Sequence, residues 1–413
     1  MLIAASRIIT ASSVGRSAAT ILAPGYVVCE AGTITGVGSG SPPRRPDAEL
    51  TGGFLLPGFV DLQVNGYYGV ELGDADPSGW ATVARRLPET GTTAFLPTFI
   101  TSPVDETIAS LRRAAAFAPG MAGPVVAGPV VASPVVASPV VANTAAQARV
   151  LGVHLEGPFI ARNRCGAHNP AWITTPDPVT INAFLDAGSG LVRVLTLAPE
   201  IDGAMAAIKQ LTAAGVLVSV GHSDATAHQV SAAAMCGARM VTHLFNGQRP
   251  LHHREPGVVG QALADTRLVS GLIADLHHVA GQVLALAFAA APGRICLVTD
   301  AAACAGMPQG RYILGGEPIE LAVGDGTPPV RADGTLAGSV LRMDSAVANM
   351  VAVGVGLCDA VAAATRIPAD LLGRPDLGRI ASGAAADLTW LNDDLRTVAT
   401  WIGGQQVYGP SLG

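Results

Sequence analysis

The sequence predicts a (β/α)8 barrel, in which eight parallel strands alternate with helices, beside a small β-sandwich domain built from both termini. The chain has 413 residues, 49% hydrophobic and 14% charged, which is enough for one large domain or two ordinary ones. Eight short apolar runs recur from residue 54 onward, and most are followed by a helical pattern. Short strand-like pieces between Gly-rich turns occur at both ends of the chain, and these predict the second domain.

The eight apolar runs are the predicted strands of the barrel. In chain order they are residues 54–66, 92–100, 149–158, 191–200, 216–224, 240–247, 267–278 and 294–301. Near-continuous apolar strands covered by helices are typical of a parallel sheet. Eight such units fit a barrel, whose usual size is about 250 residues before insertions. A doubly wound open sheet is the alternative, but no Gly-rich phosphate fingerprint follows the first strand. Ser223 or Asp224 can cap one helix, which stops at Gly237.

The expected domain limits follow the change in pattern along the chain. Residues 1–53 and 366–413 are assigned to the two parts of the sandwich, and residues 54–365 to the barrel. A hairpin inserted after the eighth strand is expected between Gly310 and Ala337, from the runs RYILGGEPIELAV and VRADGTLAG.

Composition excludes several classes of protein. The formal charge of −6 argues against a nucleic-acid partner, because phosphate binding requires a concentrated basic face. The six cysteines form no C-x-x-C pair, so we expect neither a disulfide framework nor a zinc ribbon, as in a reducing cytoplasm. Met1–Thr10 has Arg7 inside a short apolar run and lacks the charged-then-apolar order of a signal peptide. We therefore expect a cytoplasmic location.

A long uncharged stretch raises the question of a membrane span. It runs from residue 114 to 148 and contains a five-residue PVVA repeat at 124–143. A proline every fifth residue removes amide donors and clashes with the preceding turn, so a helix is not expected there. We interpret the repeat as an extended insertion, assign it no function, and expect no membrane partner.

Polar residues with catalytic potential lie at the ends of the predicted strands. Glu156 ends the third strand, His222 the fifth and Asp300 the eighth; His243 lies at or just past the end of the sixth, and His278 closes the seventh. In a barrel, the carboxyl ends of the strands surround one mouth, so residues far apart in sequence converge there.

The chemistry of these residue types indicates a metal site. Two imidazoles and a carboxylate supply three ligands to a divalent metal and leave a fourth position for water, whose pKa falls to about 7 on zinc. Asp300 can then accept the water proton and return it to the leaving group. Each residue alone has an ordinary explanation: Asp300 could cap the next helix, and Glu156 could form a salt bridge. Their joint occurrence in otherwise apolar stretches favours the metal site, because burying them without a partner is costly.

A set of motifs resembles one enzyme family. The motifs are PGFVDLQVNG (57–66), HLEGPF (154–159), GAHNP (166–170), GHSDAT (221–226), THLFNG (242–247), REPG (254–257), VTDA (298–301), LAGS (336–339) and GRIASGAAADL (378–388). In this order they resemble the N-acetylglucosamine-6-phosphate deacetylase family of the amidohydrolase superfamily, across nearly the whole chain. The resemblance implies that Glu156, His222 and His243 bind the metal and that Asp300 is the catalytic acid and base. It also implies that His168 helps to polarise the acetyl carbonyl.

The resemblance also implies the residues that bind substrate. Asn246 and Gly247 match positions that hold the sugar phosphate, and His278 matches a sugar-binding histidine, with the adjacent His277 as the alternative. Arg254 matches a phosphate contact that the neighbouring subunit can supply in this family, so we expect a homodimer; an arginine fork also suits phosphate oxygens. The remaining expected pocket residues are Ala167, Leu336, Ala337, Gly338 and Ser339.

The sequence departs from the superfamily pattern at the end of the first strand. The usual H-x-H pair, which feeds a second metal, is replaced by Gln63 and Asn65, so these two positions mark a possible vestigial second metal site. Lys209, the only lysine, lies in a predicted outer helix and cannot supply a carboxylated bridge between two metals. We therefore expect one divalent metal per subunit, with zinc first and iron, cobalt or manganese as alternatives.

Three functions are compatible with these features. The first is deacetylation of N-acetyl-D-glucosamine 6-phosphate to D-glucosamine 6-phosphate and acetate. The second is another amidohydrolase reaction on the same scaffold, on the galacto epimer of this sugar phosphate or on a cyclic amide. The third is a non-catalytic sugar-phosphate sensor, against which Asp300 argues because a sensor needs no proton shuttle. Cys165, in the loop beside the site, is interpreted as an incidental residue.

Overall fold

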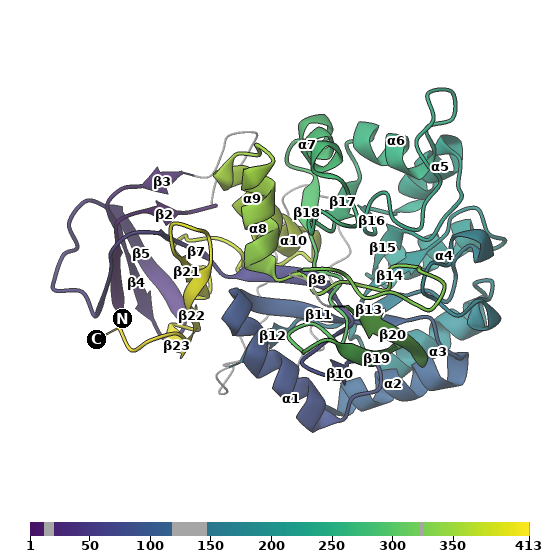
Figure 1. Ribbon diagram of the computed structural model, residues 1–413, viewed down its shortest axis with the longest axis horizontal. Coiled ribbons are helices and arrows are strands. Elements are labelled where there is room, and N and C mark those ends of the chain that lie inside the picture. Colours follow the sequence, from purple (N-terminus) through teal and green to yellow (C-terminus); the bar gives the residue numbers. More distant parts are fainter. Residues whose placement is uncertain (12–19, 118–146, 323–325, 413) are drawn as a thin grey trace.

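The computed structural model has two parts, a β-sandwich at the left of Figure 1 and a barrel at the right. It describes residues 1–11, 20–117, 147–322 and 326–412. The PVVA repeat at 124–143 lies outside the described residues.

The barrel consists of parallel strands in sequence order. They are β8 (Phe59–Val64), β11 (Thr92–Ile100), β13 (Val153–Glu156), β14 (Val192–Leu197), β15 (Leu217–Val220), β16 (Met240–Val241), β17 (Val269–Leu272) and β18 (Ile295–Leu297). A short extra strand, β12 (Arg149–Val150), pairs with β11. Each predicted apolar run contains one of the eight barrel strands, so the barrel is confirmed. The seventh strand is shorter than expected: β17 ends at Leu272, and His278 lies in the loop that follows it.

The barrel closes at a seam between its first and last strands. Val64 pairs in parallel with Ala301, just beyond the end of β18, and the backbone N–H of Asp300 donates to the carbonyl of Gln63 at 2.9 Å. The carboxylate of the buried Asp61 also lies at this seam. It accepts a hydrogen bond from the Thr299 hydroxyl at 2.6 Å and from the backbone N–H groups of Gln63 and Thr299 at 3.2 and 3.3 Å. Burial raises the pKa of Asp61 to about 7. The carboxyl group of Asp61, in the first strand, therefore forms hydrogen bonds with the segment that follows the last strand.

Helices cover the outside of the barrel and enclose a continuous apolar core. They are α1 (Pro77–Arg86), α2 (Val104–Phe117), α3 (Pro178–Gly188), α4 (Ala204–Ala213), α5 (Ala227–Cys236), α6 (Gly257–Ala264), α7 (Gly281–Ala290), α8 (Met343–Ala352), α9 (Leu357–Ala364) and α10 (Arg366–Leu371). Short 3-10 helices occur at Leu87–Thr90, Arg162–Arg164 and Pro170–Trp172.

The predicted cap of α5 is wrong, although its end at Gly237 is confirmed. Thr226 is the N-cap residue, and its hydroxyl accepts a backbone N–H of the first turn. Ser223 and Asp224 are engaged elsewhere: the Ser223 hydroxyl and the Asp224 backbone N–H both donate to the carboxylate of Glu200. Three polar residues within four positions could each cap the helix, and the contact of Ser223 and Asp224 with Glu200 leaves Thr226 as the cap.

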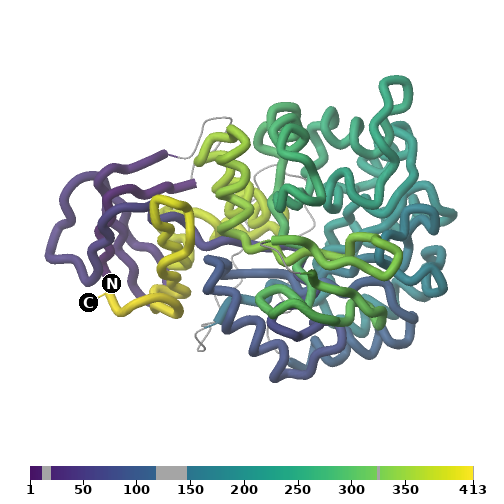
Figure 2. Tube along the Cα trace, in the orientation of Figure 1, coloured from purple at the N-terminus to yellow at the C-terminus, as the bar shows by residue number. Residues whose placement is uncertain are grey.

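Both termini build the sandwich, as expected, and Figure 2 shows the two end segments side by side. One sheet has the order β5 (Thr33–Ser39), β4 (Gly25–Glu30), β1 (Leu2–Ala5), β6 (Ala48–Leu50). The other has the order β23 (Gln405–Tyr408), β22 (Thr397–Ile402), β21 (Leu388–Leu391), β7 (Phe54–Pro57), β2 (Ile8–Ile9), β3 (Ile21–Leu22). The chain passes from β7 directly into β8. The domain limits expected from sequence remain a proposal.

Two hairpins lie outside the barrel sheet. β19 (Gly310–Leu314) and β20 (Glu317–Leu321) pair antiparallel, as expected for the insertion after the eighth strand. They pack on a small apolar cluster of their own, which includes Ala337. A second, shorter hairpin joins β9 (Gly66–Tyr67) to β10 (Val70–Glu71).

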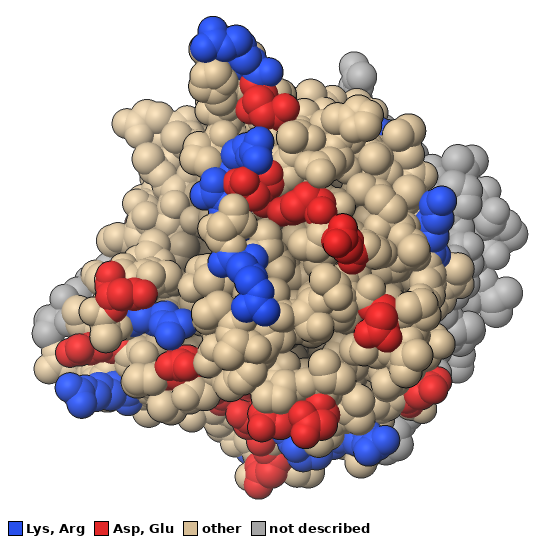
Figure 3. All heavy atoms as spheres, turned by 90° about the vertical axis from the view of Figure 1, so that its right-hand side faces the viewer, with Lys and Arg blue, Asp and Glu red and all other residues tan. Residues whose placement is uncertain are grey.

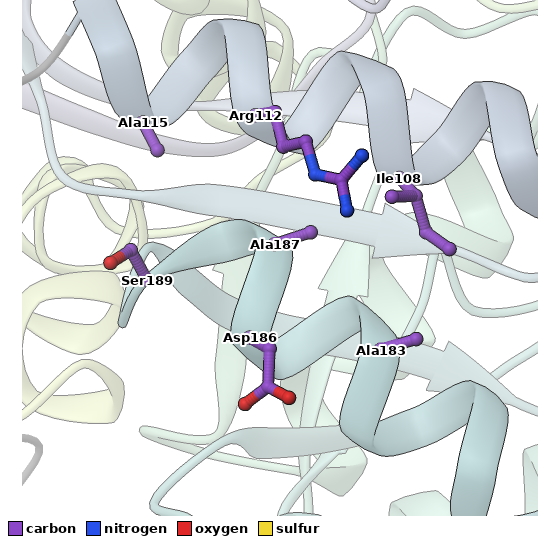
Figure 4. Close-up of a pocket in the computed structure, with 7 residues that line it drawn as sticks. All are labelled: Ile108, Arg112, Ala115, Ala183, Asp186, Ala187 and Ser189. Atoms are coloured by element: carbon purple, nitrogen blue, oxygen red, sulfur yellow. The ribbon is translucent and has the colours of Figure 1, made fainter.

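The outer surface carries mixed charge, and a hollow lies between two of its helices. In Figure 3, Lys and Arg side chains are interspersed with Asp and Glu across the face that is shown. A hollow of about 470 Å³ lies between α2 and α3. Figure 4 shows its lining residues, which are Ile108, Arg112, Ala115, Ala183, Asp186, Ala187 and Ser189. These lining residues include none that the sequence predicts for the functional site. Among the described helices, none combines the length and apolar composition needed to cross a bilayer.

The seam gives a prediction about stability. Asp61→Ala leaves buried backbone N–H groups of Gln63 and Thr299 without an acceptor, which should lower the free energy of unfolding by about 3–5 kcal/mol. Asp61→Asn should cost much less, because its amide oxygen can accept the same donors. Urea denaturation followed by circular dichroism measures both variants; equal midpoints for the two would contradict this account of the seam.

Candidate active site

Three buried side chains from three strands meet at the carboxyl end of the barrel. Glu156 is the last residue of β13, while His222 and His243 lie two residues beyond β15 and β16. Glu156 Oε1 is 2.9 Å from His243 Nε2 and 3.3 Å from His222 Nε2, and the two Nε2 atoms are 3.1 Å apart. Their ligand atoms could hold a metal ion. The structure thus brings together the three residues that the sequence predicts as metal ligands.

The hydrogen bonds of this cluster leave lone pairs facing one another. His222 Nδ1 lies 2.8 Å from the carbonyl oxygen of Arg164, which can only accept, so Nδ1 carries the hydrogen and the neutral ring has a bare Nε2. His243 Nδ1 is buried with no hydrogen-bond partner among the described residues. Two imidazoles and a carboxylate packed this closely need a positive charge between them. The donor set and its spacing fit a divalent metal.

The pKa shifts of His243 and Glu156 also indicate that this cluster favours positive charge. Burial opposes a charged ring, yet the hydrogen bond and negative charge of Glu156 raise the pKa of His243 to about 9. Burial likewise opposes the carboxylate, but the hydrogen bond from His243 and the positive charge of a protonated imidazole beside it hold the pKa of Glu156 well below its usual value. A proton therefore occupies the cluster when no other cation does, and a metal must displace it.

Asp300 lies beside this cluster and is held by two amides. Its Oδ1 accepts hydrogen bonds from Asn65 Nδ2 at 2.7 Å and from Gln63 Nε2 at 3.0 Å, and the latter amide also lies 3.2 Å from Glu156 Oε1. Burial and the negative charge of Glu156 raise the pKa of Asp300 to about 6. The amide hydrogens of Gln63 and Asn65 thus bring partial positive charge to the carboxylates of Asp300 and Glu156, where a cation would bring a full charge.

His168 closes the cluster on another side. Its ring centroid is 4.3 Å from that of His222, and its Nε2 is 4.0 Å from Glu156 Oε2. Burial, together with the nearby His222, lowers the pKa of His168 to about 3, so the ring is neutral. The Nδ1 atom is held by Thr101, whose hydroxyl oxygen is 2.7 Å away.

The backbone at these positions is unusual. His222, His243 and Asp300 have φ values of 46°, 22° and 52°, in the left-handed region that most residues avoid. Leu276, in the loop after β17, has φ 67°. Such conformations cost energy and persist where the surroundings fix them, and they are concentrated at functional sites. At three strand ends the chain turns sharply, and this turn aims the side chain into the mouth.

The predicted substrate-binding residues after the sixth and seventh strands lie in two loops. Gly247 packs against the His222 ring, and Asn246 Nδ2 lies 3.3 Å from the carbonyl oxygen of His243. Arg254 is exposed in the loop before α6 and is not part of the buried cluster. His278 is oriented by Asp275, whose Oδ2 lies 2.6 Å from its Nδ1.

The remaining predicted pocket residues belong to the LAGS loop at 336–339 and to Ala167. Ser339 supports the Asp300 turn: its backbone N–H donates to the carbonyl of Asp300, and its hydroxyl donates to the carbonyl of Thr299. Ala337 is buried, whereas Leu336 is 36% exposed and Gly338 is half-buried. The carbonyl oxygen of Ala167 accepts a hydrogen bond from Arg331 at 2.9 Å.

Sequence reasoning missed the residues that orient the predicted ones. Thr101 holds His168, Asp275 holds His278, and the carbonyl of Arg164 holds His222. A weak signal existed for the first two, since Thr101 directly follows a predicted strand and Asp275 precedes His278 by three residues. Nothing in a sequence reveals a carbonyl contact. Lys209 is exposed on the outer helix α4, as expected.

Comparison with known proteins identifies the family. The sequence profile of the amidohydrolase family matches residues 54–407. The chain is an amidohydrolase. Among curated amidohydrolases it is 38% identical to N-acetylglucosamine-6-phosphate deacetylase of Bos taurus over 86% of this chain and 84% of the relative. It is 37% identical to N-acetylgalactosamine-6-phosphate deacetylase of Escherichia coli O157:H7, over 87% and 88%.

Solved structures of amidohydrolases give the same result for the fold. The structure of N-acetyl-D-glucosamine-6-phosphate deacetylase from Mycobacterium smegmatis superposes with a TM-score of 0.85 at 33% identity, over 99% of this chain and 100% of that one. The barrel and sandwich are therefore those of this family, and the chain is a hydrolase that acts on an amide. Amidohydrolases typically depend on a metal, and the cluster of Glu156, His222 and His243 is a group that could bind one.

The contact between Gly247 and His222 gives a prediction about metal affinity. A Cβ at Gly247 would lie 2.7 Å from His222 Nδ1 and 3.3 Å from the carbonyl oxygen of Arg164, so Gly247→Ala should displace the ring and weaken metal binding roughly 10–100-fold. Gly293→Ala is the matched control, because Gly293 has a similar φ of +70° and open space around it. Competitive titration with a chelating dye measures both affinities, and equal values for the two variants would disprove the contact.

Proposed function

We propose that this chain removes the acetyl group from N-acetyl-D-glucosamine 6-phosphate, giving D-glucosamine 6-phosphate and acetate. The observation that carries the proposal is the buried cluster of Glu156, His222 and His243, with Asp300 and His168 beside it. This arrangement offers a metal site, a base and a hydrogen-bond donor around one point. Relatives that deacetylate this sugar phosphate by name share 33–38% of their residues with the chain.

Glu156, His222 and His243 would hold one divalent metal, and zinc is the metal we propose. Such a cation supplies positive charge that polarises an amide carbonyl and acidifies water. Gln63 and Asn65 favour a single metal, because their amide hydrogens already neutralise the carboxylates at the second position. Fe²⁺, Co²⁺ and Mn²⁺ are the alternatives, since histidine and carboxylate ligands accept all of them.

Asp300 would act as general base and then as general acid. With a pKa of about 6, its carboxylate is largely ionised at neutral pH and can take a proton from the attacking water. The protonated carboxyl group can then deliver that proton to the departing amine. The hydrogen bonds from Asn65 and Gln63 to one carboxylate oxygen fix its orientation and leave the other for this exchange.

The rest of the mouth would bind the substrate. His168 would donate a hydrogen bond to the acetyl oxygen, and His278 would contact the sugar. Asn246, Gly247 and Arg254 would hold the phosphate; Arg254 is exposed, as suits a residue that reaches into the mouth of a second subunit. We therefore propose a homodimer. We also propose a cytoplasmic location, as the cysteine pattern suggests. The pocket would be completed by Ala167, Leu336, Ala337, Gly338 and Ser339.

A second substrate is favoured by one specific observation. The relative from Escherichia coli O157:H7, 37% identical to this chain, is a deacetylase of N-acetylgalactosamine 6-phosphate. The two sugars differ only in the configuration of one hydroxyl group. Deacetylation of the galacto epimer is therefore the alternative that we keep, ahead of other amidohydrolase reactions on this scaffold.

Acetate release from three sugars tests the proposal. The metal-loaded enzyme should hydrolyse N-acetylglucosamine 6-phosphate with a kcat/KM at least tenfold above that for the galacto epimer, and far above that for unphosphorylated N-acetylglucosamine. A reversed order for the two phosphorylated sugars would establish the alternative. No acetate from either of them would refute both.

Two substitutions separate metal binding from proton transfer. Asp300→Asn should retain the metal while kcat falls roughly 10²–10⁴-fold, and asparagine also tolerates the left-handed backbone at this position. Glu156→Ala should instead lose the metal, because it removes one of three ligands. Elemental analysis with steady-state kinetics measures both; a fully loaded Glu156→Ala enzyme would show that the ligand assignment is wrong.

A further inference from the structure

We propose that Thr101 is a positioning residue that holds His168 in the tautomer with its hydrogen on Nε2. That nitrogen faces the Glu156 cluster, so the ring presents a donor to the reaction centre. The inference rests on the proposed role of His168 in binding the acetyl oxygen. It assigns a function to Thr101, which directly follows the second barrel strand. Neither the sequence motifs nor the metal site gives this residue a role.

Thr101 reaches His168 with two groups. It directly follows β11 and is 1% exposed. Its backbone nitrogen is 3.3 Å and its hydroxyl oxygen 2.7 Å from His168 Nδ1. The same hydroxyl oxygen lies 3.2 Å from the carbonyl oxygen of Glu156. One residue therefore connects the imidazole to the end of the strand that carries a predicted metal ligand.

The backbone N–H of Thr101 decides which tautomer the ring adopts. A hydroxyl can donate or accept, but a backbone N–H can only donate. A hydrogen on His168 Nδ1 would point toward this N–H and leave two buried donors facing each other. The single hydroxyl hydrogen of Thr101 has two acceptors within reach, His168 Nδ1 at 2.7 Å and the Glu156 carbonyl oxygen at 3.2 Å. Because the backbone N–H is directed at Nδ1, the neutral ring keeps its lone pair there, the hydroxyl donates to this nearer acceptor, and the ring carries its hydrogen on Nε2.

Crowding keeps the Thr101 hydroxyl in place. A Cβ at Gly157 would lie 2.1 Å from Thr101 Oγ1, so the hydroxyl fills the space that a side chain at residue 157 would need. It is enclosed by the His168 ring, the Glu156 carbonyl and the Gly157 backbone. The orientation of the ring is thus fixed in the folded protein, before any substrate binds.

The chemical consequence is clearest in comparison with His222. That ring gives its Nδ1 hydrogen to a carbonyl and presents a lone pair, as a metal ligand must. His168 meets a backbone N–H in place of a carbonyl, so it presents a hydrogen. A donor at this position stabilises negative charge that develops on an acetyl oxygen, whereas a lone pair would repel it. Two adjacent histidines therefore acquire opposite roles from opposite backbone partners.

Nitrogen NMR of the zinc-loaded protein tests the tautomer directly. The chain has nine histidines, and the His168 signals are assigned by their loss in His168→Gln. Two-bond proton–nitrogen correlation should show His168 with a hydrogen on Nε2 and a lone pair on Nδ1, and His222 with the reverse. A hydrogen on His168 Nδ1 would overturn the proposal. Because this measurement involves no turnover, it stands even if neither sugar phosphate is a substrate.

Kinetics of two Thr101 variants test its effect on catalysis. Thr101→Val keeps the backbone N–H, and with it the tautomer, but removes the hydroxyl that holds the ring at 2.7 Å. The loosened ring should lower kcat roughly 10–100-fold with little change in KM or zinc content. Thr101→Ser keeps the hydroxyl and should restore most of the rate, which a merely structural role in packing would not predict. Thr101→Val should cause no further loss when combined with His168→Gln. A full additional loss in the double variant, or a parental rate for Thr101→Val, would refute the proposal.

Discussion

The site depends on one constraint: two imidazole nitrogens and a carboxylate oxygen, all buried, lie within 3.3 Å of each other. Such an arrangement is stable only around a cation. The surroundings are arranged to keep it so. A carbonyl fixes the hydrogen of His222, left-handed turns aim His222 and His243 inward, and the amides of Gln63 and Asn65 donate hydrogen bonds to the neighbouring Asp300 carboxylate. The barrel supplies the rigid strand ends on which this depends.

Much of this architecture could be predicted from the sequence because its signals are local. A continuous apolar run ending in a polar residue marks both a buried parallel strand and its carboxyl end, as with Glu156, the last residue of β13. The same reasoning placed His278 too close to its strand, because the loop after Leu272 begins with the apolar residues Ile273 and Ala274, which resemble a continuation of the strand. The cap of α5 was misplaced for a related reason, since only the tertiary partner Glu200 distinguishes Ser223 from Thr226.

The hydrogen bonds that support the barrel seam and the site could not be predicted. They join segments far apart in the sequence, and which partner donates depends on the folded structure. Asp61 resembles any polar residue within an apolar strand until Thr299, 238 positions away, is beside it. Thr101 directly follows a strand, as many threonines do, and only its contact with His168, 67 positions away, distinguishes it from them. The tautomer of a ring follows from whether it meets an N–H or a carbonyl, and no pattern of side chains encodes that difference.

The position of the seam has a consequence for folding. The contacts that join the first strand to the last, 237 residues apart, are also those that orient Asp300 through Gln63. Loops of this length close late, because their entropic cost must be offset by contacts formed earlier. We therefore expect Asp300 to reach its place late in folding. If Asp300 transfers the proton as proposed, a barrel that opens transiently along this seam loses activity before it unfolds, and loss of activity on gentle heating should precede loss of helical structure.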